Sequence, residues 1–265
     1  MFQKEGERVK TLYENDVLSP PKTSVGLPDA TRAVSQVESL DWHGIVDELN
    51  QSGNALLKGI LTPRECQALT SLYPSDAYFR SRVVMSRYGF GRGEYKYFSY
   101  PLPDILQGLR TSLYKLLAPV ANEWNQQMGK DIRYPAKHAD FIQHCHKEGQ
   151  LRPTPLLLQY GAGDYNCLHQ DLYGEHVFPI QVAFLLSESE KDFTGGEFVL
   201  TEQRPRMQSR AEVVPLRQGD GVAFAVHHRP VRGTRGSYRV NLRHGVSRVR
   251  SGKRYTIGII FHDAE

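Results

Sequence analysis

The stretch that decides the fold runs from Leu156 to Asp171 and spells Leu-Leu-Leu-Gln-Tyr-Gly-Ala-Gly-Asp-Tyr-Asn-Cys-Leu-His-Gln-Asp. Its apolar start predicts a buried strand, and its glycines predict a bend before a second extended segment. Residues two apart in an extended backbone point to the same face, so His169 and Asp171 can bind one metal ion together. A third ligand is available in the C-terminal part of the chain, at His244.

The sequence pattern on either side of this stretch predicts a fold built from packed β-sheets. Many short runs rich in β-forming residues, separated by turn residues, indicate a β-sandwich or jelly roll. The fold class we expect is therefore mainly β with a helical N-terminal half (α+β), in which the helices pack on one face of a jelly roll. The expected strands are 155–160, 165–169, 179–186, 196–200, 212–216, 221–226, 238–243 and 254–262.

The first half of the chain is expected to support that core. Residues 1–40 are polar and interrupted by prolines, which favours a loosely packed N-terminal arm. Residues 41–150 carry helix signals and a basic, aromatic hairpin at 80–100, and residues 151–265 form the catalytic core. Helices are expected after the N-cap Asp41, after the capping box Thr62–Glu65, and over 103–128 and 136–146.

The composition suits one packed core with a modest positive charge. The chain has 265 residues, of which 40% are hydrophobic, a net charge of +4 and a pI near 8.9. This charge permits a polyanionic partner but does not require one.

Cysteine usage and the apolar pattern predict a cytoplasmic protein. Cys66, Cys145 and Cys167 are far apart and form no CxxC pair, which argues against a disulfide framework and a cysteine zinc site. No apolar run approaches the roughly 20 residues of a membrane helix. The first residues also lack the apolar segment of a signal peptide. We therefore expect a reducing compartment, no membrane association and no obligate protein partner.

Two histidines and one carboxylate form the ligand set of a facial triad. His169, Asp171 and His244 on one side of an ion would leave three positions open, which suits non-haem Fe(II) that reacts with dioxygen. Zinc binds similar residues, but a catalytic zinc site normally keeps one open position. Arg254 lies in the last expected strand, and its planar guanidinium matches a carboxylate co-substrate.

Together these motifs resemble the Fe(II)- and 2-oxoglutarate-dependent oxygenases. A His-x-Asp pair is common by chance, but here Gly195-Gly196-Glu197, Gly219-Asp220, His244 and Arg254 follow it in order. The resemblance implies a double-stranded β-helix, which is a distorted jelly roll, over residues 156–261. It also implies Fe(II), 2-oxoglutarate and dioxygen as cofactor and co-substrates. The implied iron ligands are His169, Asp171 and His244, and the implied 2-oxoglutarate contacts are Arg254 and Tyr160.

Two branches of this superfamily are similar to the chain. The segment 160–171 is similar to AlkB-type nucleic-acid demethylases, although Leu158 and Ile260 stand where those enzymes usually carry an asparagine and a second arginine. The two glycine motifs and the basic residue after the distal histidine resemble prolyl hydroxylases instead. Residues 169–262 also resemble an uncharacterised bacterial group labelled as oxygenases of damaged DNA.

The hairpin at 80–100 is the candidate substrate contact. Its alternating basic and aromatic residues can hold phosphates while stacking a base that has left its helix. The same pattern also suits a hairpin whose aromatic residues enter the core and whose cations face solvent. The candidate substrate residues are Arg87, Tyr88, Phe90 and Arg92.

The remaining basic residues and histidines are assigned to other roles. Arg204, Arg206, Arg210 and Arg217 are assigned to a solvated loop. His228, beside His227, is a weaker metal candidate, and it is assigned with His176 and His262 to loops or strand ends.

Three hypotheses of function follow from the sequence. The leading one is oxidative demethylation or hydroxylation of DNA or RNA, as in repair of alkylation damage. The alternative is hydroxylation of a protein or peptide side chain, as in prolyl hydroxylases. The third is a catalytically silent jelly roll used for binding.

Overall fold

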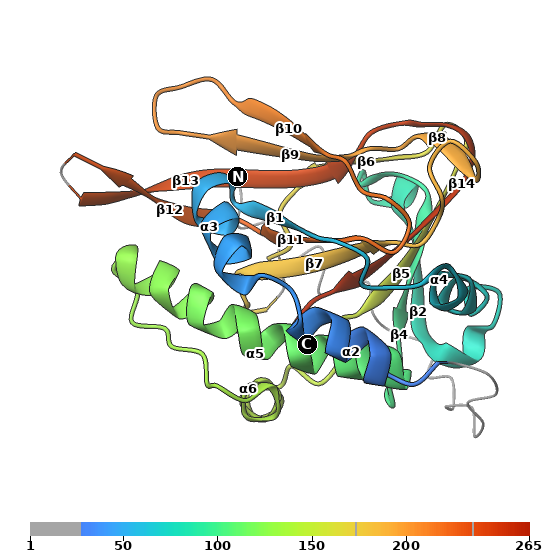
Figure 1. The fold of residues 1–265 in the computed structure, drawn as a ribbon, viewed down its shortest axis with the longest axis horizontal. Helices are drawn as coiled ribbons and strands as arrows, with labels where there is room; N and C mark the ends of the chain where they lie inside the picture. Colours follow the sequence, from blue (N-terminus) through green and yellow to red (C-terminus); the bar gives the residue numbers. More distant parts are fainter. Residues whose placement is uncertain (1–27, 173, 235) are drawn as a thin grey trace.

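Two antiparallel β-sheets form a jelly-roll sandwich in the computed structural model, which describes residues 28–172, 174–234 and 236–265 (Figure 1). The larger sheet has the strand order β1-β11-β7-β14-β5-β4-β2, with β8 beside β14. The smaller sheet has the order β10-β9-β13-β6-β3, with β12 beside β13. The bounds are β1 Asn54–Leu57, β2 Phe79–Val84, β3 Gly91–Arg92, β4 Glu94–Phe98, β5 Leu156–Gly161, β6 Tyr165–His169, β7 Ile180–Leu185, β8 Phe193–Gly195, β9 Phe198–Gln203, β10 Arg210–Val214, β11 Gly221–Ala225, β12 His228–Gly233, β13 Gly236–Val246 and β14 Val249–Ile259.

This architecture confirms the expected fold class. Every strand expected in the second half is present close to its expected bounds, and the hairpin at 80–100 is present as the antiparallel pair β2 and β4. Two strands, β8 and β12, were not expected. Because β12 includes His228, the assignment of that histidine to a loop is wrong.

The helices lie on one side of the larger sheet, as expected (Figure 1). Asp41 accepts a hydrogen bond from the backbone N–H of Gly44, and Thr62 forms the full capping box with Glu65. The long helix continues through Pro119. The bounds are α2 Thr31–Glu38, α3 Trp42–Ser52, α4 Pro63–Thr70, α5 Asp104–Gln127 and α6 His138–Lys147, with short 3₁₀ turns at Asp76–Tyr78 and Met85–Arg87.

The expectation of a loose polar arm over 1–40 is wrong for its last part. Residues Thr31–Glu38 form α2, and the side chains of Ala33 and Val37 are fully buried. A β-carbon on Gly108 would lie 2.4 Å from the Ala30 β-carbon, so a glycine in α5 allows the segment at the start of α2 to approach closely. Residues 1–27 lie outside the part that the structure describes.

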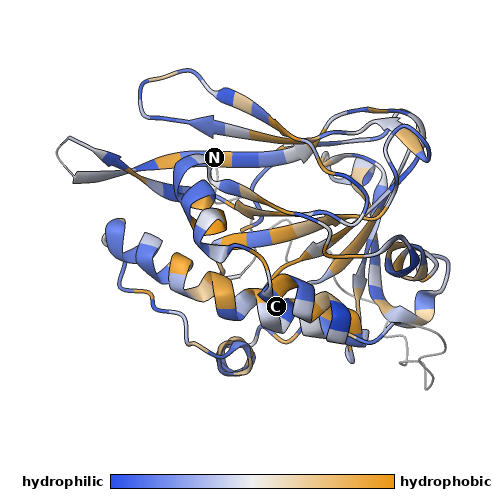
Figure 2. Ribbon diagram, viewed as in Figure 1, coloured by the Kyte–Doolittle hydropathy of each residue, from blue (hydrophilic) through white to orange (hydrophobic). Residues whose placement is uncertain are grey.

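Strand alternation in the larger sheet separates two environments. On β7, Ile180, Val182 and Phe184 pack in the cluster shared with the helices, whereas Ala183 and Leu185 face the space between the two sheets. Figure 2 shows hydrophobic residues gathered on the central strands and on the middle of α5. Each fully buried large apolar side chain contributes roughly 1.5–3 kcal/mol, so this layer dominates the stability.

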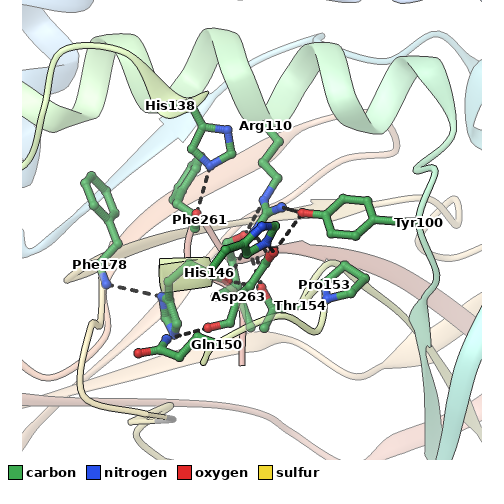
Figure 3. Close-up of polar contacts among 12 residues, drawn as sticks. Tyr100, Arg110, His138, His146, Gln150, Pro153, Thr154, Phe178, Phe261 and Asp263 are labelled. Atoms are coloured by element: carbon green, nitrogen blue, oxygen red, sulfur yellow. Dashed lines mark hydrogen bonds and ion pairs between the residues drawn. The ribbon is translucent and has the colours of Figure 1, made fainter. Parts of the chain in front are cut away.

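A buried polar network joins α5, α6 and the segment after β14 (Figure 3). The Arg110 guanidinium donates to the Asp263 carboxylate at 2.8 Å, to the carbonyl of Ile260 at 2.8 Å and to the Tyr100 hydroxyl at 2.9 Å. His146 Nε2 lies 2.8 Å from the second oxygen of Asp263. Arg110 and Asp263 are almost completely buried, so each charge depends on the other for compensation.

Two expectations concern the redox state and the membrane. The three cysteines are free thiols. Within the described residues, no helix is long and apolar enough to cross a membrane. The cytoplasmic location stays a prediction.

Candidate metal centre

The three predicted metal-binding residues meet in the space between the sheets. His169 ends β6 and lies directly opposite His244 in β13, and Asp171 follows two residues after β6. One ligand atom from each residue lies within 4.8 Å of the others. His169 Nε2 is 3.3 Å and His244 Nε2 is 3.4 Å from the two oxygens of Asp171. The set therefore converges on one point, as a metal centre requires.

An irregularity in the pairing of β6 with β13 determines which way His169 points. His244 pairs with His169 and Val246 pairs with Asn166. Between these two pairs, β6 contains one residue more than β13. A β-bulge of this kind turns a side chain to the other face of its strand. Because Val246 and His244 share the inner face, Asn166 and His169 do as well. Sequence alternation alone places Asn166 and His169 on opposite faces.

The three residues of the triad shift one another's pKa values. Burial raises the pKa of Asp171, but His169 and His244 outweigh it and hold that pKa well below its usual value. Burial lowers the pKa of His244, and the neighbouring His169 lowers it further. The pKa of His169 is raised, since Asp171 and the Cys167 carbonyl outweigh burial. Asp171 is thus ionised, and His244 offers a neutral imidazole.

The orientation of His169 leaves the correct nitrogen available. Its Nδ1 lies 2.8 Å from the carbonyl oxygen of Cys167, so Nδ1 carries the proton and donates it to that carbonyl. Nε2 then faces Asp171, and a metal ion bound there would replace the proton that Asp171 favours on this nitrogen. A hydrogen bond of this kind fixes the tautomer of a metal-binding histidine.

Arg254 and Tyr160 lie beside each other in the same interior. They are directly paired on β14 and β5, and the Arg254 guanidinium carbon is 5.7 Å from the centre of the Tyr160 ring. Arg254 donates to the Thr256 hydroxyl, and its Nε has no partner among the described residues. Burial lowers the pKa of Arg254 to about 10, partly offset by Tyr160 and Glu197. A buried cation without a close carboxylate is costly, and an anionic ligand bound beside it would compensate its charge.

Tyr160 carries a hydroxyl suited to a ligand. Its ring is fully buried, and burial raises the pKa of the hydroxyl to about 12, so it stays protonated. The hydroxyl has no hydrogen bond of good geometry in the described part, although the Asn166 side chain is close enough to lower its pKa slightly. It can donate to an incoming carboxylate.

Two glycines make room for these side chains. A β-carbon on Gly196 would lie 2.9 Å from Cδ of Arg254, and one on Gly93 would lie 2.8 Å from Cδ1 of Tyr160. Both glycines also have positive φ angles, 65° and 114°, which other residues rarely adopt. The glycine motif at 195–196 and the glycines of the hairpin therefore serve close packing around this site.

Aromatic rings line the triad. The Phe224 ring centre lies 4.6 Å and the Phe198 ring centre 6.1 Å from that of His244, while Phe193 lies beside Arg254. Such rings exclude water, and low polarity strengthens the electrostatic interactions of the site. Sequence reasoning missed these phenylalanines and Asn166, although strand alternation could have identified the phenylalanines.

The predicted substrate residues lie on the strand edge beside the triad. β3 pairs with β6, so that Arg92 is opposite Tyr165, and the Cys167 N–H donates to the Phe90 carbonyl at 2.9 Å. Arg87 is exposed, and Tyr88 packs against Phe90 with ring centres 5.6 Å apart. These residues are therefore near the chain that carries His169.

Other predicted histidines do not join the triad. The ring of His228 lies against that of His227, and His176 meets His144 edge to face. His262 follows the end of β14, as expected, and its side chain is fully buried. Among the described residues, the group that could hold a metal is His169, Asp171 and His244.

The fold is similar to that of solved oxygenases, and the triad has the two-histidine, one-carboxylate ligand set of non-haem Fe(II) oxygenases. A prolyl-4-hydroxylase of Pseudomonas putida aligns over 84% of this chain and 99% of its own, at 13% identity and a TM-score of 0.51. A prolyl hydroxylase of Trichoplax adhaerens, solved with a hypoxia inducible factor peptide, aligns over 88% and 93%, at 15% identity and a TM-score of 0.51. The epimerase SnoN of nogalamycin biosynthesis aligns over 83% and 81%, at 12% identity and a TM-score of 0.51. At these identities the likeness establishes the fold.

Sequence similarity gives the family within that class. Residues 93–264 match the Oxygenase-NA family, described as an oxygenase catalysing oxidative methylation of damaged DNA. An uncharacterized protein of Mycobacterium tuberculosis, Rv2227 in strain H37Rv, is 49% identical over 167 residues, which are 63% of this chain and 72% of the relative. The chain therefore belongs to the Oxygenase-NA family.

Fe(II) and 2-oxoglutarate fit the residues present. The donor set is two imidazoles and one carboxylate, which suits Fe(II). Arg254 Nε and the Tyr160 hydroxyl are buried polar atoms without a good partner in the described residues. Such atoms are costly unless a ligand satisfies them. This agrees with the expected Fe(II), 2-oxoglutarate and dioxygen.

Proposed function

We propose that this protein is an Fe(II)- and 2-oxoglutarate-dependent oxygenase that hydroxylates a C–H bond of nucleic acid, with demethylation of an alkylated base as the leading case. His169, Asp171 and His244 would hold iron, and Arg254 and Tyr160 would hold the distal carboxylate of 2-oxoglutarate. Iron and 2-oxoglutarate bound together would supply an oxidative decarboxylation in which dioxygen gives one oxygen atom to succinate and one to the substrate C–H bond, while carbon dioxide leaves.

The chain's own residues have separate tasks in this chemistry. Asp171 stays ionised and holds the two imidazoles toward one point. Arg254 supplies a buried positive charge for the co-substrate, and Tyr160 adds a neutral donor. The aromatic rings around His244 keep water from the reacting centre.

One observation carries the nucleic-acid part of the proposal: β3 is hydrogen-bonded to β6, the strand that carries His169. This pairing places the segment 87–92, with the cations Arg87 and Arg92 and the ring of Tyr88, next to the strand that carries His169. Tyr88 is 36% exposed, enough for stacking. Stacking an unpaired base on an aromatic ring contributes roughly 1–3 kcal/mol. The family's description, an oxygenase of damaged DNA, supports the same substrate.

A second candidate is hydroxylation of a protein side chain, and charge pairing in the hairpin favours it. Arg82 pairs with Glu94, and the buried Lys96 pairs with Asp76 at 2.6 Å. Arg80 lies over the ring of Tyr97. The hairpin therefore offers nucleic acid fewer available cations than its sequence suggests. Solved relatives of the same fold include prolyl hydroxylases.

The test is succinate formation by the iron-loaded protein with panels of methylated oligonucleotides and of peptides. We expect oligonucleotides to stimulate turnover and peptides to leave it at its basal rate. Arg87→Gln together with Arg92→Gln should weaken binding of single-stranded DNA and reduce its salt dependence by about two phosphate contacts. Arg133→Gln, which removes an exposed arginine beyond the end of α5, is the matched control.

Stimulation by peptides alone would replace nucleic acid with protein as the substrate. Oligonucleotide binding that is unchanged in the double variant would remove the hairpin from the substrate site. Absence of iron uptake and of succinate formation would leave only the binding-protein hypothesis.

A further inference from the structure

Buried polar atoms without partners concentrate in the interior of the jelly roll. In the described part of the chain, such atoms are rare, and apart from Ser112 Oγ on α5 and His262 Nε2 beyond β14 they belong to strands of the two sheets. Native proteins satisfy the great majority of buried polar groups, so exceptions mark places where a ligand or water binds. The atoms other than Ser112 Oγ are Tyr160 Oη, Gln181 Nε2, His244 Nδ1, Arg254 Nε and His262 Nε2. A 2-oxoglutarate site accounts for Tyr160 and Arg254, and His244 is a predicted metal ligand through its other nitrogen, Nε2, which leaves Gln181 and His262.

Gln181 lies on the inner face of β7 beside the metal centre. It alternates with Ile180 and Val182, which pack toward the helices. It pairs directly with Phe224 of β11, whose ring centre lies 4.6 Å from that of His244. Its side chain is 5% exposed, and its Nε2 has no partner in the described residues. The amide donor of Gln181 is thus buried beside Phe224, one of the aromatic rings that line the triad.

His262 follows β14 and presents a second donor. Its Nδ1 accepts a hydrogen bond from the backbone N–H of Phe178 at 3.2 Å, so the proton of the neutral ring lies on Nε2. Burial lowers the pKa of His262 to about 4, and Arg110 lowers it further, so the ring is neutral at physiological pH. His262 follows the last β14–β7 pair, which joins Ile259 to Val182, the neighbour of Gln181.

These two donors are too far from Arg254 to share its ligand. β14 pairs with β7 at Thr256 opposite Leu185 and Ile259 opposite Val182. In this register Arg254 and Gln181 differ by about six residues along the strands, or roughly 20 Å. A five-carbon diacid held by Arg254 is much shorter than this distance. The acceptor that satisfies Gln181 must therefore be another group.

We propose that Gln181 and His262 bind the primary substrate, by donating hydrogen bonds to a neutral acceptor such as a carbonyl oxygen. Both groups are uncharged donors, so they suit a carbonyl and disfavour a cation or an amino group at that position. This inference rests on the proposed function: for nucleic acid it selects an alkylated base with oxo groups, such as 3-methylthymine, over 1-methyladenine, which has none.

The experiment measures binding without turnover. The protein is loaded with Mn(II) and 2-oxoglutarate in the absence of oxygen and titrated into labelled single strands containing one 3-methylthymine or one 1-methyladenine. We expect the wild type to bind 3-methylthymine more tightly. Gln181→Met has similar volume and removes the donor, so it should weaken binding of 3-methylthymine about 10-fold and leave 1-methyladenine unchanged.

Two further measurements separate substrate binding from a structural role. Gln181→Met should keep the wild-type affinity for 2-oxoglutarate, measured by calorimetry, and should unfold no more easily than the wild type. Gln159→Met makes the same substitution on the outer face of β5, where Gln159 accepts from the Tyr255 hydroxyl. This control should not change the preference between the two bases. His262→Phe provides an independent variant of the second donor.

The outcomes distinguish this inference from the proposed function. If the wild type binds and oxidises methylated strands but Gln181→Met and His262→Phe keep its preference, the two donors are satisfied by water and the inference is wrong. An equal loss for both bases, or a loss of 2-oxoglutarate affinity, also overturns it. If the wild type recognises neither strand, the nucleic-acid function itself fails, and the inference fails with it.

Discussion

Replacing Arg254 with methionine should stabilise the free protein and abolish its stabilisation by 2-oxoglutarate. The guanidinium is 1% exposed, and among the described residues its hydrogen-bond partner is a neutral hydroxyl. Burial lowers its pKa from 12.5 to about 10. This difference of about 2.5 units means that folding destabilises the charged form by roughly 3 kcal/mol. Methionine keeps much of the aliphatic packing but loses some, so we expect a net gain of about 1–2 kcal/mol.

The sign of the effect follows from the direction of the shift. Arg254 is charged in both the folded and the unfolded chain at neutral pH, so the cost is fully present below the folded pKa of about 10. It decreases only as the pH rises above that value. The stability difference between wild type and variant should therefore be constant across the neutral range.

The assay is urea unfolding of the Mn(II)-loaded protein with and without 2-oxoglutarate. At a concentration 100 times its dissociation constant, the co-substrate should stabilise the wild type by about 2.7 kcal/mol and the variant by nothing. Arg229→Met is the contrasting control: this buried arginine pairs with Glu202 and donates to the carbonyls of Asn50 and Gln51, so its loss leaves these acceptors without their donor and should cost about 1–3 kcal/mol, although Arg204 still pairs with Glu202. If Arg254→Met unfolds more easily than the wild type and still gains stability from 2-oxoglutarate, the argument for an anion site is refuted.

Three more predictions concern the metal, the glycines and the buried network. Asp171→Ala should lower metal affinity by at least 10-fold and abolish succinate formation, and a chelator should have the same effect on the wild type until Fe(II) is restored. Gly196→Ala places a β-carbon 2.9 Å from Arg254 at a φ of 65°, so it should weaken 2-oxoglutarate binding more than metal binding, which calorimetry can separate. Burial raises the pKa of Asp263, but Arg110 outweighs burial and lowers that pKa below its usual value of 3.8. The stability that the ion pair contributes is therefore fully present above pH 3.8. It is lost as the pH falls through the pKa of the folded state. Asp263→Asn should therefore cost about 3 kcal/mol at neutral pH and progressively less in acid unfolding; an equal cost at all pH values would contradict the ion pair.

The fold and the metal triad were predictable because local signals agree with the global structure. Strand alternation and turn residues gave the jelly roll, and the capping box at Thr62 marked the start of a helix that the structure contains. His169 and Asp171 are close in sequence, and the resemblance to a known ligand pattern, not a local propensity, selected His244, which pairs with His169 in the smaller sheet. Residue types that chelate iron are few, so their order along the chain identifies them.

The rest depends on register, which the sequence does not display. The bulge in β6 reverses the face of one short segment, and that step brings Asn166 into the site. The pairing of β3 with β6 joins residues about 75 positions apart, and no local pattern specifies it. His262 carries no motif, since its role depends on where β14 ends and on the backbone N–H of Phe178. Long-range pairing is the part of a fold that local propensity leaves undetermined.

The contact of Gly93 with Tyr160 has a consequence for the evolution of this protein. β4 runs from the hairpin that would meet the substrate and pairs with β5, and β5 pairs with β14, which carries Arg254. A residue other than glycine at position 93 would displace the Tyr160 ring, because its β-carbon would lie 2.8 Å from that ring. Substrate choice and co-substrate affinity are thus inherited together. A graft of this hairpin from a relative should transfer specificity only when the strand beneath it is exchanged as well.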